Sequence, residues 1–132
     1  MKILITGNLG YLGPVVVRHL RETIKNAYIV GYDTGYFSHC LTTRDRLADT
    51  MCDQQVFGDL RDITREFVSQ FDGIVLLAAI SNDPMGEKFA EVTDAINHKG
   101  CLNVIEKIDD LSSKTIVFAS SCSMYGAGGD EP

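Results

Sequence analysis

Three glycines near the start of the chain have the spacing and the neighbours of a phosphate-binding turn. Gly7, Gly10 and Gly13 follow an apolar run at residues 2–6 and come before a stretch with helical periodicity. Glycine allows a tight turn, a close approach of the backbone to a ligand, and close packing of a helix on a strand. The free N–H groups at the start of the helix attract phosphate oxygens, and Pro14 removes only a donor without a helical partner. The pattern predicts a pyrophosphate site, although a glycine-rich turn without a ligand has the same appearance.

An aspartate downstream makes this prediction more specific. Asp33 ends a second apolar run, residues 28–32, about 20 residues beyond the glycines, where dinucleotide-binding units place an acid. Its carboxylate can accept hydrogen bonds from both hydroxyls of an adenosine ribose, and its charge repels a 2′-phosphate. The position therefore favours NAD over NADP, although an aspartate at a strand end is also a common turn or capping residue.

A second acid follows a predicted third strand at residues 55–57. Asp59 can accept a hydrogen bond from the exocyclic amine of adenine, and Leu60 can pack on the ring. The next two residues, Arg61 and Asp62, are expected to form a solvated pair. The glycine-aspartate dipeptide alone is an ordinary turn, so the adenine-binding interpretation depends on its position after a strand.

The elements that must position these residues alternate along the chain. Apolar runs predict five strands, and helical spacing predicts helices between them: strands at 2–6, 28–32, 55–57, 73–79 and 115–119, and helices at 15–26, 63–70 and 95–108. This alternation predicts an α/β fold, a Rossmann-type doubly wound parallel sheet in the order 3-2-1-4-5 with crossover helices on both faces.

Composition limits the classes of function. The chain has 132 residues, 45% of them hydrophobic, enough for one domain spanning residues 1–132. No apolar run approaches the length of a membrane span and no signal-peptide cleavage site follows the start, so we expect a cytoplasmic protein. A net charge of −6 without a basic cluster argues against nucleic acid. The four cysteines and three histidines lack metal-ligand spacing, so we expect no metal site.

The candidate residues occur together and in a definite order. The set comprises the glycine motif, Asp33, Gly58-Asp59-Leu60, Leu77-Ala78-Ala79, Asn97 with Gly100 and Asn103, and the run Ser120-Ser121-Cys122-Ser123-Met124-Tyr125-Gly126. It resembles the extended short-chain dehydrogenase/reductase family, and within it the NAD-dependent epimerases and dehydratases that act on nucleoside-diphosphate sugars. The resemblance covers essentially the whole chain. Asn8 replaces the commoner second glycine, at a site that tolerates small or polar residues with unusual backbone angles.

The resemblance implies a role for each matching residue. The implied cofactor-binding residues are Gly7, Gly10, Tyr11, Leu12, Gly13, Asp33, Asp59, Leu60, Leu77, Ala78, Ala79 and Asn97. Ala78 and Ala79 would line the nicotinamide side, and Asn97 would fix the region beneath it, although it is nearly as well explained as an ordinary polar residue on a helix. Ser121 matches the catalytic Ser/Thr that hydrogen-bonds the sugar oxygen undergoing oxidation. Ser123 matches an adjacent position that touches substrate or assists acid/base transfer, although serines at a strand end also cap turns.

The family's catalytic base is missing from the sequence. Its chemistry uses a Tyr with a Lys four residues later, and none of the five tyrosines has that Lys. We therefore expect an incomplete NAD-binding domain, truncated before the sixth strand and the C-terminal substrate lobe, and inactive by itself. The strand at 115–119 should then present an unpaired apolar edge that drives homo-oligomer formation. A non-catalytic dinucleotide-binding module and a fragment of a related reductase for a small carbonyl compound remain as alternatives.

Overall fold

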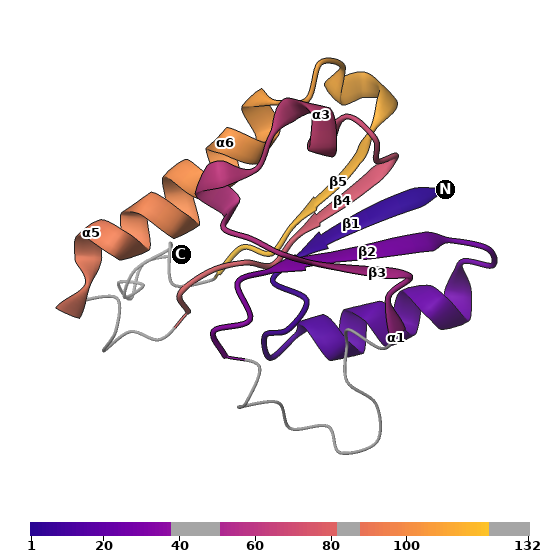
Figure 1. The fold of residues 1–132 in the computed structure, drawn as a ribbon, viewed down its shortest axis with the longest axis horizontal. Coiled ribbons are helices and arrows are strands. Elements are labelled where there is room, and N and C mark those ends of the chain that lie inside the picture. The colour runs from indigo at the N-terminus through magenta and orange to yellow at the C-terminus, as the bar shows by residue number, and fades with distance from the viewer. Residues whose placement is uncertain (38–50, 82–87, 122–132) are drawn as a thin grey trace, which may run out of the picture.

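A five-stranded parallel sheet forms the centre of the molecule. The computed structural model describes residues 1–37, 51–81 and 88–121, and its strands lie in the order β3-β2-β1-β4-β5 (Figure 1). The strands are β1 (Lys2–Thr6), β2 (Tyr28–Asp33), β3 (Gln54–Phe57), β4 (Gly73–Leu76) and β5 (Thr115–Phe118). The predicted fold class and strand order are confirmed. The fourth strand ends three residues before the predicted 79.

Helices cover both faces of this sheet (Figure 1). On one face lies α1 (Gly13–Thr23), and on the other lie α3 (Arg65–Val68) and a long helix made of α5 (Ala90–Thr93), the π-helical segment η3 (Asp94–Gly100) and α6 (Cys101–Glu106). Short 3₁₀ turns, η2 (Leu60–Asp62) and η4 (Leu111–Ser113), complete the described elements. The first helix ends before the predicted residue 26, because Asn26 adopts a left-handed φ of 63° that turns the chain into β2.

The core is divided by the sheet into two layers. Successive side chains of a strand point to opposite faces, so β1 sends Leu4 to the layer under α3 and α6, and Ile3 and Ile5 to the layer under α1. All three side chains are at most 2% exposed. The sheet is therefore fixed from both sides, and the turns at its carboxyl ends are held on a rigid support.

The strand β5 lies at one end of the sheet order. It pairs with β4 in parallel register, and two of its apolar side chains, Val117 and Phe118, are 51% and 57% exposed. Within the described part of the chain, no helix is long and apolar enough to cross a membrane.

Candidate functional site

The turn after β1 packs closely between the carboxyl ends of β2 and β4. Gly7 adopts a φ of +73°, and its N–H donates to the Tyr32 carbonyl at 2.9 Å. A Cβ on Gly7 would lie 2.6 Å from the Ala78 nitrogen and 2.8 Å from the Leu77 carbonyl carbon. Only glycine satisfies both the backbone angle and this close approach, so the tight turn predicted for Gly7 is a real steric requirement.

The other two glycines of the motif have different surroundings. A Cβ on Gly13 would lie 2.0 Å from the Asn8 carbonyl oxygen, so only glycine lets the first turn of α1 pack this closely on the glycine turn. Within the part of the chain that the structure describes, a Cβ on Gly10 would meet only the Gly7 oxygen, at 3.2 Å. The open side of Gly10 leaves the space that a ligand needs to approach the backbone.

The start of α1 is available to an anion. Among the described residues no side chain caps the helix at Leu12, and the first turn of the helix contains no acidic residue. Tyr11, Leu12 and Val15 are 82%, 51% and 63% exposed around this end. The N–H groups of a first helical turn lack intrahelical partners and carry partial positive charge, which favours phosphate.

Asp33 joins the end of β2 to the glycine turn. Its Oδ2 accepts a hydrogen bond from the Leu9 N–H at 3.0 Å, and its Oδ1 accepts one from the Gly35 N–H at 2.8 Å. Each carboxylate oxygen keeps a further lone pair that could accept from a ribose hydroxyl. No Lys or Arg occurs among residues 34–37 to neutralise a 2′-phosphate.

The second acid is engaged by a neighbouring arginine. Asp59 accepts from the backbone N–H and the Nε of Arg61, both at 2.9 Å, and from its guanidinium terminus at 2.6 Å. The side-chain hydrogen bond from Arg61 lowers the pKa of Asp59. The expected pairing of Arg61 with Asp62 was therefore wrong. Leu60 is 4% exposed and packs in the core against Gly100, and its contact with adenine stays a prediction.

The long helix holds the segments that follow β3 and β4. Asn97 makes two hydrogen bonds with the backbone of Ile80: its Oδ1 accepts from the N–H at 2.7 Å, and its Nδ2 donates to the carbonyl at 2.8 Å. Asn103 donates to the Leu60 carbonyl at 2.8 Å. Asn97 thus anchors the chain next to Ala78 and Ala79, and the cofactor contacts of these three residues remain predictions.

Only the first two residues of the serine run, Ser120 and Ser121, lie within the described residues. Ser121 is exposed and follows β5, whereas Ser123 and Tyr125 lie outside the described residues. The catalytic roles expected of Ser121 and Ser123 stay predictions.

Sequence reasoning missed a contact between two side-chain amides, one on Asn8 in the glycine turn and one on Gln55 in β3. The side chain of Asn8 is fully buried, and its Nδ2 donates to the Gln55 Oε1 at 2.6 Å. Asn26 is the only non-glycine residue with a positive φ in the described part of the chain, so unusual backbone angles do not explain Asn8. One signal was present: Gly31 interrupts an apolar strand, and a glycine there often marks close approach of another group.

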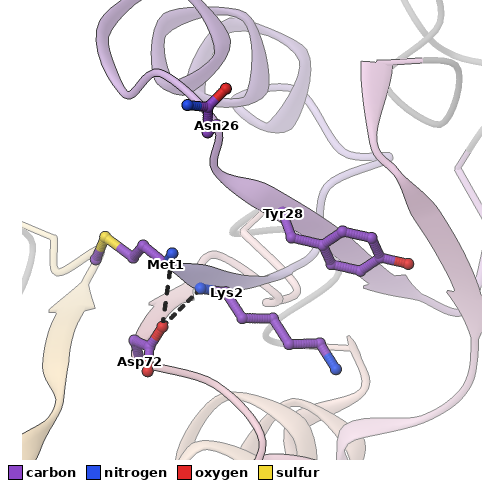
Figure 2. A pocket seen from close by; sticks show the side chains of 5 residues that line it. All are labelled: Met1, Lys2, Asn26, Tyr28 and Asp72. Carbon is purple, nitrogen blue, oxygen red and sulfur yellow. Dashed lines mark hydrogen bonds and ion pairs between the residues drawn. The ribbon is translucent and has the colours of Figure 1, made fainter.

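The amino end of the sheet carries a hollow of about 440 Å³, lined by Met1, Lys2, Asn26, Tyr28 and Asp72 (Figure 2). Asp72 accepts from the Lys2 backbone N–H at 2.7 Å and lies 4.0 Å from the Met1 amine. The volume suits a small ligand, but these polar groups are exposed and bond one another instead of converging on the hollow. The candidate site is the carboxyl end of the sheet.

A parallel sheet whose first turn combines three glycines, an open helix start and an acid at the end of the second strand defines a dinucleotide-binding domain of the Rossmann type. The model of the NAD dependent epimerase/dehydratase family matches residues 3–132, and the chain belongs to this family. The family's cofactor is NAD.

Curated relatives give the same assignment. The chain is 28% identical over 140 residues to Protein CapI of Staphylococcus aureus and 29% identical over 132 residues to UDP-glucose 4-epimerase of Lacticaseibacillus casei. These alignments cover 100% and 96% of the chain, but only 41% and 37% of the relatives. Among solved structures, Pal from Bacillus thuringiensis is 27% identical with a TM-score of 0.75, covering 98% of this chain and 42% of Pal.

Proposed function

We propose that this chain is the NAD-binding portion of a nucleotide-sugar epimerase or dehydratase. The observation that carries the proposal is the turn at Gly7, which is held between β2 and β4 and bonded through the Leu9 N–H to Asp33. Membership of the family and similarity to a UDP-glucose 4-epimerase support it. When bound, NAD supplies a transient acceptor for a hydride from the sugar.

Each end of the dinucleotide has proposed partners in the chain. The pyrophosphate would lie over Gly10 and the first N–H groups of α1, and the adenosine ribose on Asp33. Asp59 would accept from the adenine amine, and Ala78 and Ala79 would leave room for the nicotinamide. Ser121 would donate a hydrogen bond to the sugar oxygen, with Ser123 beside it. The nucleotide sugar and the turnover belong to the complete enzyme, because the sequence has no Tyr with a Lys four residues later.

Calorimetric titration with NAD, NADP and UDP-glucose tests this proposal. We expect the chain to bind NAD, to bind NADP more weakly because Asp33 repels the 2′-phosphate, and not to turn over UDP-glucose. Asp33→Ala should weaken NAD binding by about tenfold or more, because a ribose hydrogen-bond partner and a support of the glycine turn are both lost. Asp53→Asn, at the opposite end of the sheet, is the matched control. Absence of NAD binding by the unmodified chain would refute the proposal.

We also propose that the chain self-associates through β5. Its exposed Val117 and Phe118 border a strand edge, and unpaired edges with apolar side chains promote association. Val117→Lys should shift a dimer toward monomer in sedimentation velocity, while Val92→Lys on α5, at a side chain 45% exposed, should not. A monomer at high concentration without any substitution would contradict this proposal.

A further inference from the structure

The burial of a polar side chain, that of Asn8, in the glycine turn needs a structural explanation. Asn8 is 0% exposed, and an amide in such a place is destabilising unless its polar atoms find partners. Its Nδ2 donates to Gln55 Oε1 at 2.6 Å, and the Gln55 Nε2 donates back to Asn8 Oδ1 at 3.3 Å. The two amides therefore satisfy each other across 47 positions of sequence. This reciprocal contact is called the amide pair below.

A glycine in β2 leaves the space that this contact occupies. Gly31 of β2 is the register partner of both Ile5 in β1 and Gln55 in β3. A Cβ on Gly31 would lie 2.3 Å from the Asn8 Nδ2 and 2.5 Å from the Gln55 Oε1. The amide pair thus crosses directly over the backbone of β2, through space that any other residue at position 31 would fill.

The amide pair is one of three contacts by which consecutive residues of the glycine turn bind the neighbouring strands. It is the middle contact of the three. Gly7 donates from its backbone to the Tyr32 carbonyl at 2.9 Å, Asn8 reaches Gln55, and Leu9 donates to Asp33 at 3.0 Å. Of the three, only the attachment of Asn8 extends past β2 to β3. A rotation of the turn about β2 would break the amide pair and would carry the Leu9 N–H away from the Asp33 carboxylate.

We infer that Asn8 and Gln55 are positioning residues for the adenosine half of the dinucleotide site. The amide pair holds the glycine turn in the one orientation in which Asp33 and the neighbouring N–H groups face the ligand together. Such preorganisation raises affinity because the turn does not have to be ordered on binding. The inference rests on the proposed function, since it concerns the affinity of that site for NAD.

The test compares ligand affinity with fold stability in the 132-residue chain. Gln55→Leu keeps the approximate volume but removes the close acceptor of the Asn8 Nδ2, which then keeps only its long contact with the Cys52 sulfur at 3.9 Å. We expect affinity for NAD to fall about tenfold. ADP-ribose, which lacks the nicotinamide, should lose the same factor, because the effect acts on the adenosine half. Gln55→Glu restores an acceptor for the Asn8 Nδ2 and should bind NAD more tightly than Gln55→Leu. Calorimetry gives the affinities and thermal unfolding gives the stability.

Two further variants separate positioning from general destabilisation. Gln70→Leu removes a side chain that bonds Lys2 and the Glu66 carbonyl at the far end of the sheet, and its NAD affinity should equal that of the unmodified chain. Asn8→Gly removes the amide without leaving a buried polar atom on the turn, so it tests the inference even if Gln55→Leu does not fold. It should also bind NAD about tenfold more weakly.

The outcomes distinguish the inference from the proposed function. If the unmodified chain binds NAD and both Gln55→Leu and Asn8→Gly bind it equally well, the inference is overturned. A loss of NAD affinity without the same loss for ADP-ribose also overturns it. If the unmodified chain does not bind NAD, the result refutes the proposed function, on which the inference rests.

Discussion

The polar side chains at the two ends of the same sheet hold different segments: the turns around the glycine motif at one end, and the connections between elements at the other. At the carboxyl end, Asp33 and Asn97 bond backbone groups of the turns around them and fix those turns in place. At the amino end, Lys2 and Asp72 bond near neighbours at the surface, around a hollow of about 440 Å³ (Figure 2). The hollow therefore does not by itself identify a site. The proposed site rests instead on backbone donors held in a fixed arrangement.

The direction of the helices explains much of this difference. In a parallel sheet with crossover helices, each helix begins near the carboxyl end of the preceding strand and ends near the amino end of the next one. The positive helix end thus lies beside Gly10, whereas α1 ends near Asn26 and the amino hollow. The helix dipole therefore favours an anionic ligand at the first position and disfavours one at the second.

The largest effect is expected from Gly7→Ala. The substitution combines a left-handed φ with a Cβ 2.6 Å from the Ala78 nitrogen, and these costs together are about 3 kcal/mol or more of unfolding free energy. Gly10→Ala is the matched variant, because the one described atom near its Cβ is the Gly7 oxygen at 3.2 Å. It should change stability by less than about 1 kcal/mol but weaken NAD binding. Urea denaturation and calorimetry together check both; equal stability losses would contradict the assignment of separate roles.

A comparison of two strand glycines should give the next largest effect. Gly31→Ala places a Cβ 2.3 Å from Asn8, whereas Gly73→Ala at the amino end meets first the flexible end of Met1, at 3.2 Å. We expect a loss of about 2 kcal/mol for Gly31→Ala and much less for Gly73→Ala. In an Asn8→Gly background, Gly31→Ala should regain about 1 kcal/mol of its loss, measured as a coupling energy in a double-mutant cycle. Strict additivity would show that Asn8 is not the obstacle.

The strands and their order could be predicted because they depend on local patterns. Separated apolar runs define parallel strands buried on both faces, and short crossovers leave few arrangements of them. The roles of Gly7 and Asp33 as the turn and its adjoining acid followed from their positions next to predicted strand ends. None of these inferences needed the position of a distant side chain.

The amide pair and the pairing of Arg61 could not be predicted in this way. Asn8 and Gln55 meet because β1, β2 and β3 align in one particular register, and a sequence does not display register. Arg61 has acids at 59 and 62, and only the geometry of the 3₁₀ turn decides that it bonds Asp59. The π-helical segment at Asp94–Gly100 was missed for a similar reason, since its apolar spacing is close to that of an ordinary helix.

A smaller difference in stability is expected between variants of two amide side chains, each of which makes two hydrogen bonds. Asn97 bonds the N–H and carbonyl of Ile80 at the carboxyl end, and Gln70 bonds Lys2 and the Glu66 carbonyl at the exposed amino end. Asn97→Ala should cost about 1 to 2 kcal/mol, and Gln70→Ala less than about 0.5 kcal/mol, since water replaces the lost partners of exposed groups. Chemical denaturation measures both. A greater loss from Gln70→Ala would reverse the comparison between the two ends.

The smallest effect concerns an acid at the amino end that stabilises the fold without belonging to the site. Arg21 of α1 donates to the carbonyls of Met51 and Ala27 and to Asp53, which lies just before β3. Asp53 also accepts from the Ile29 N–H at 2.7 Å. Burial raises the pKa of Asp53, but the hydrogen bonds from Ile29 and Arg21 outweigh it, so the pKa lies below the ordinary value.

A lowered pKa in the folded state gives this acid a definite pH dependence. Between the folded and the unfolded pKa the unfolded chain binds more protons, so stability falls as the pH falls. The stabilisation by Asp53 is complete above the unfolded pKa, near pH 4, and is lost as the pH drops through the folded value. Unfolding free energies of the unmodified chain and of Asp53→Asn should differ by about 0.5 kcal/mol at pH 7 and converge in acid. NAD affinity at pH 7 should be the same in both; a difference there would mean that the amino end contributes to the site after all.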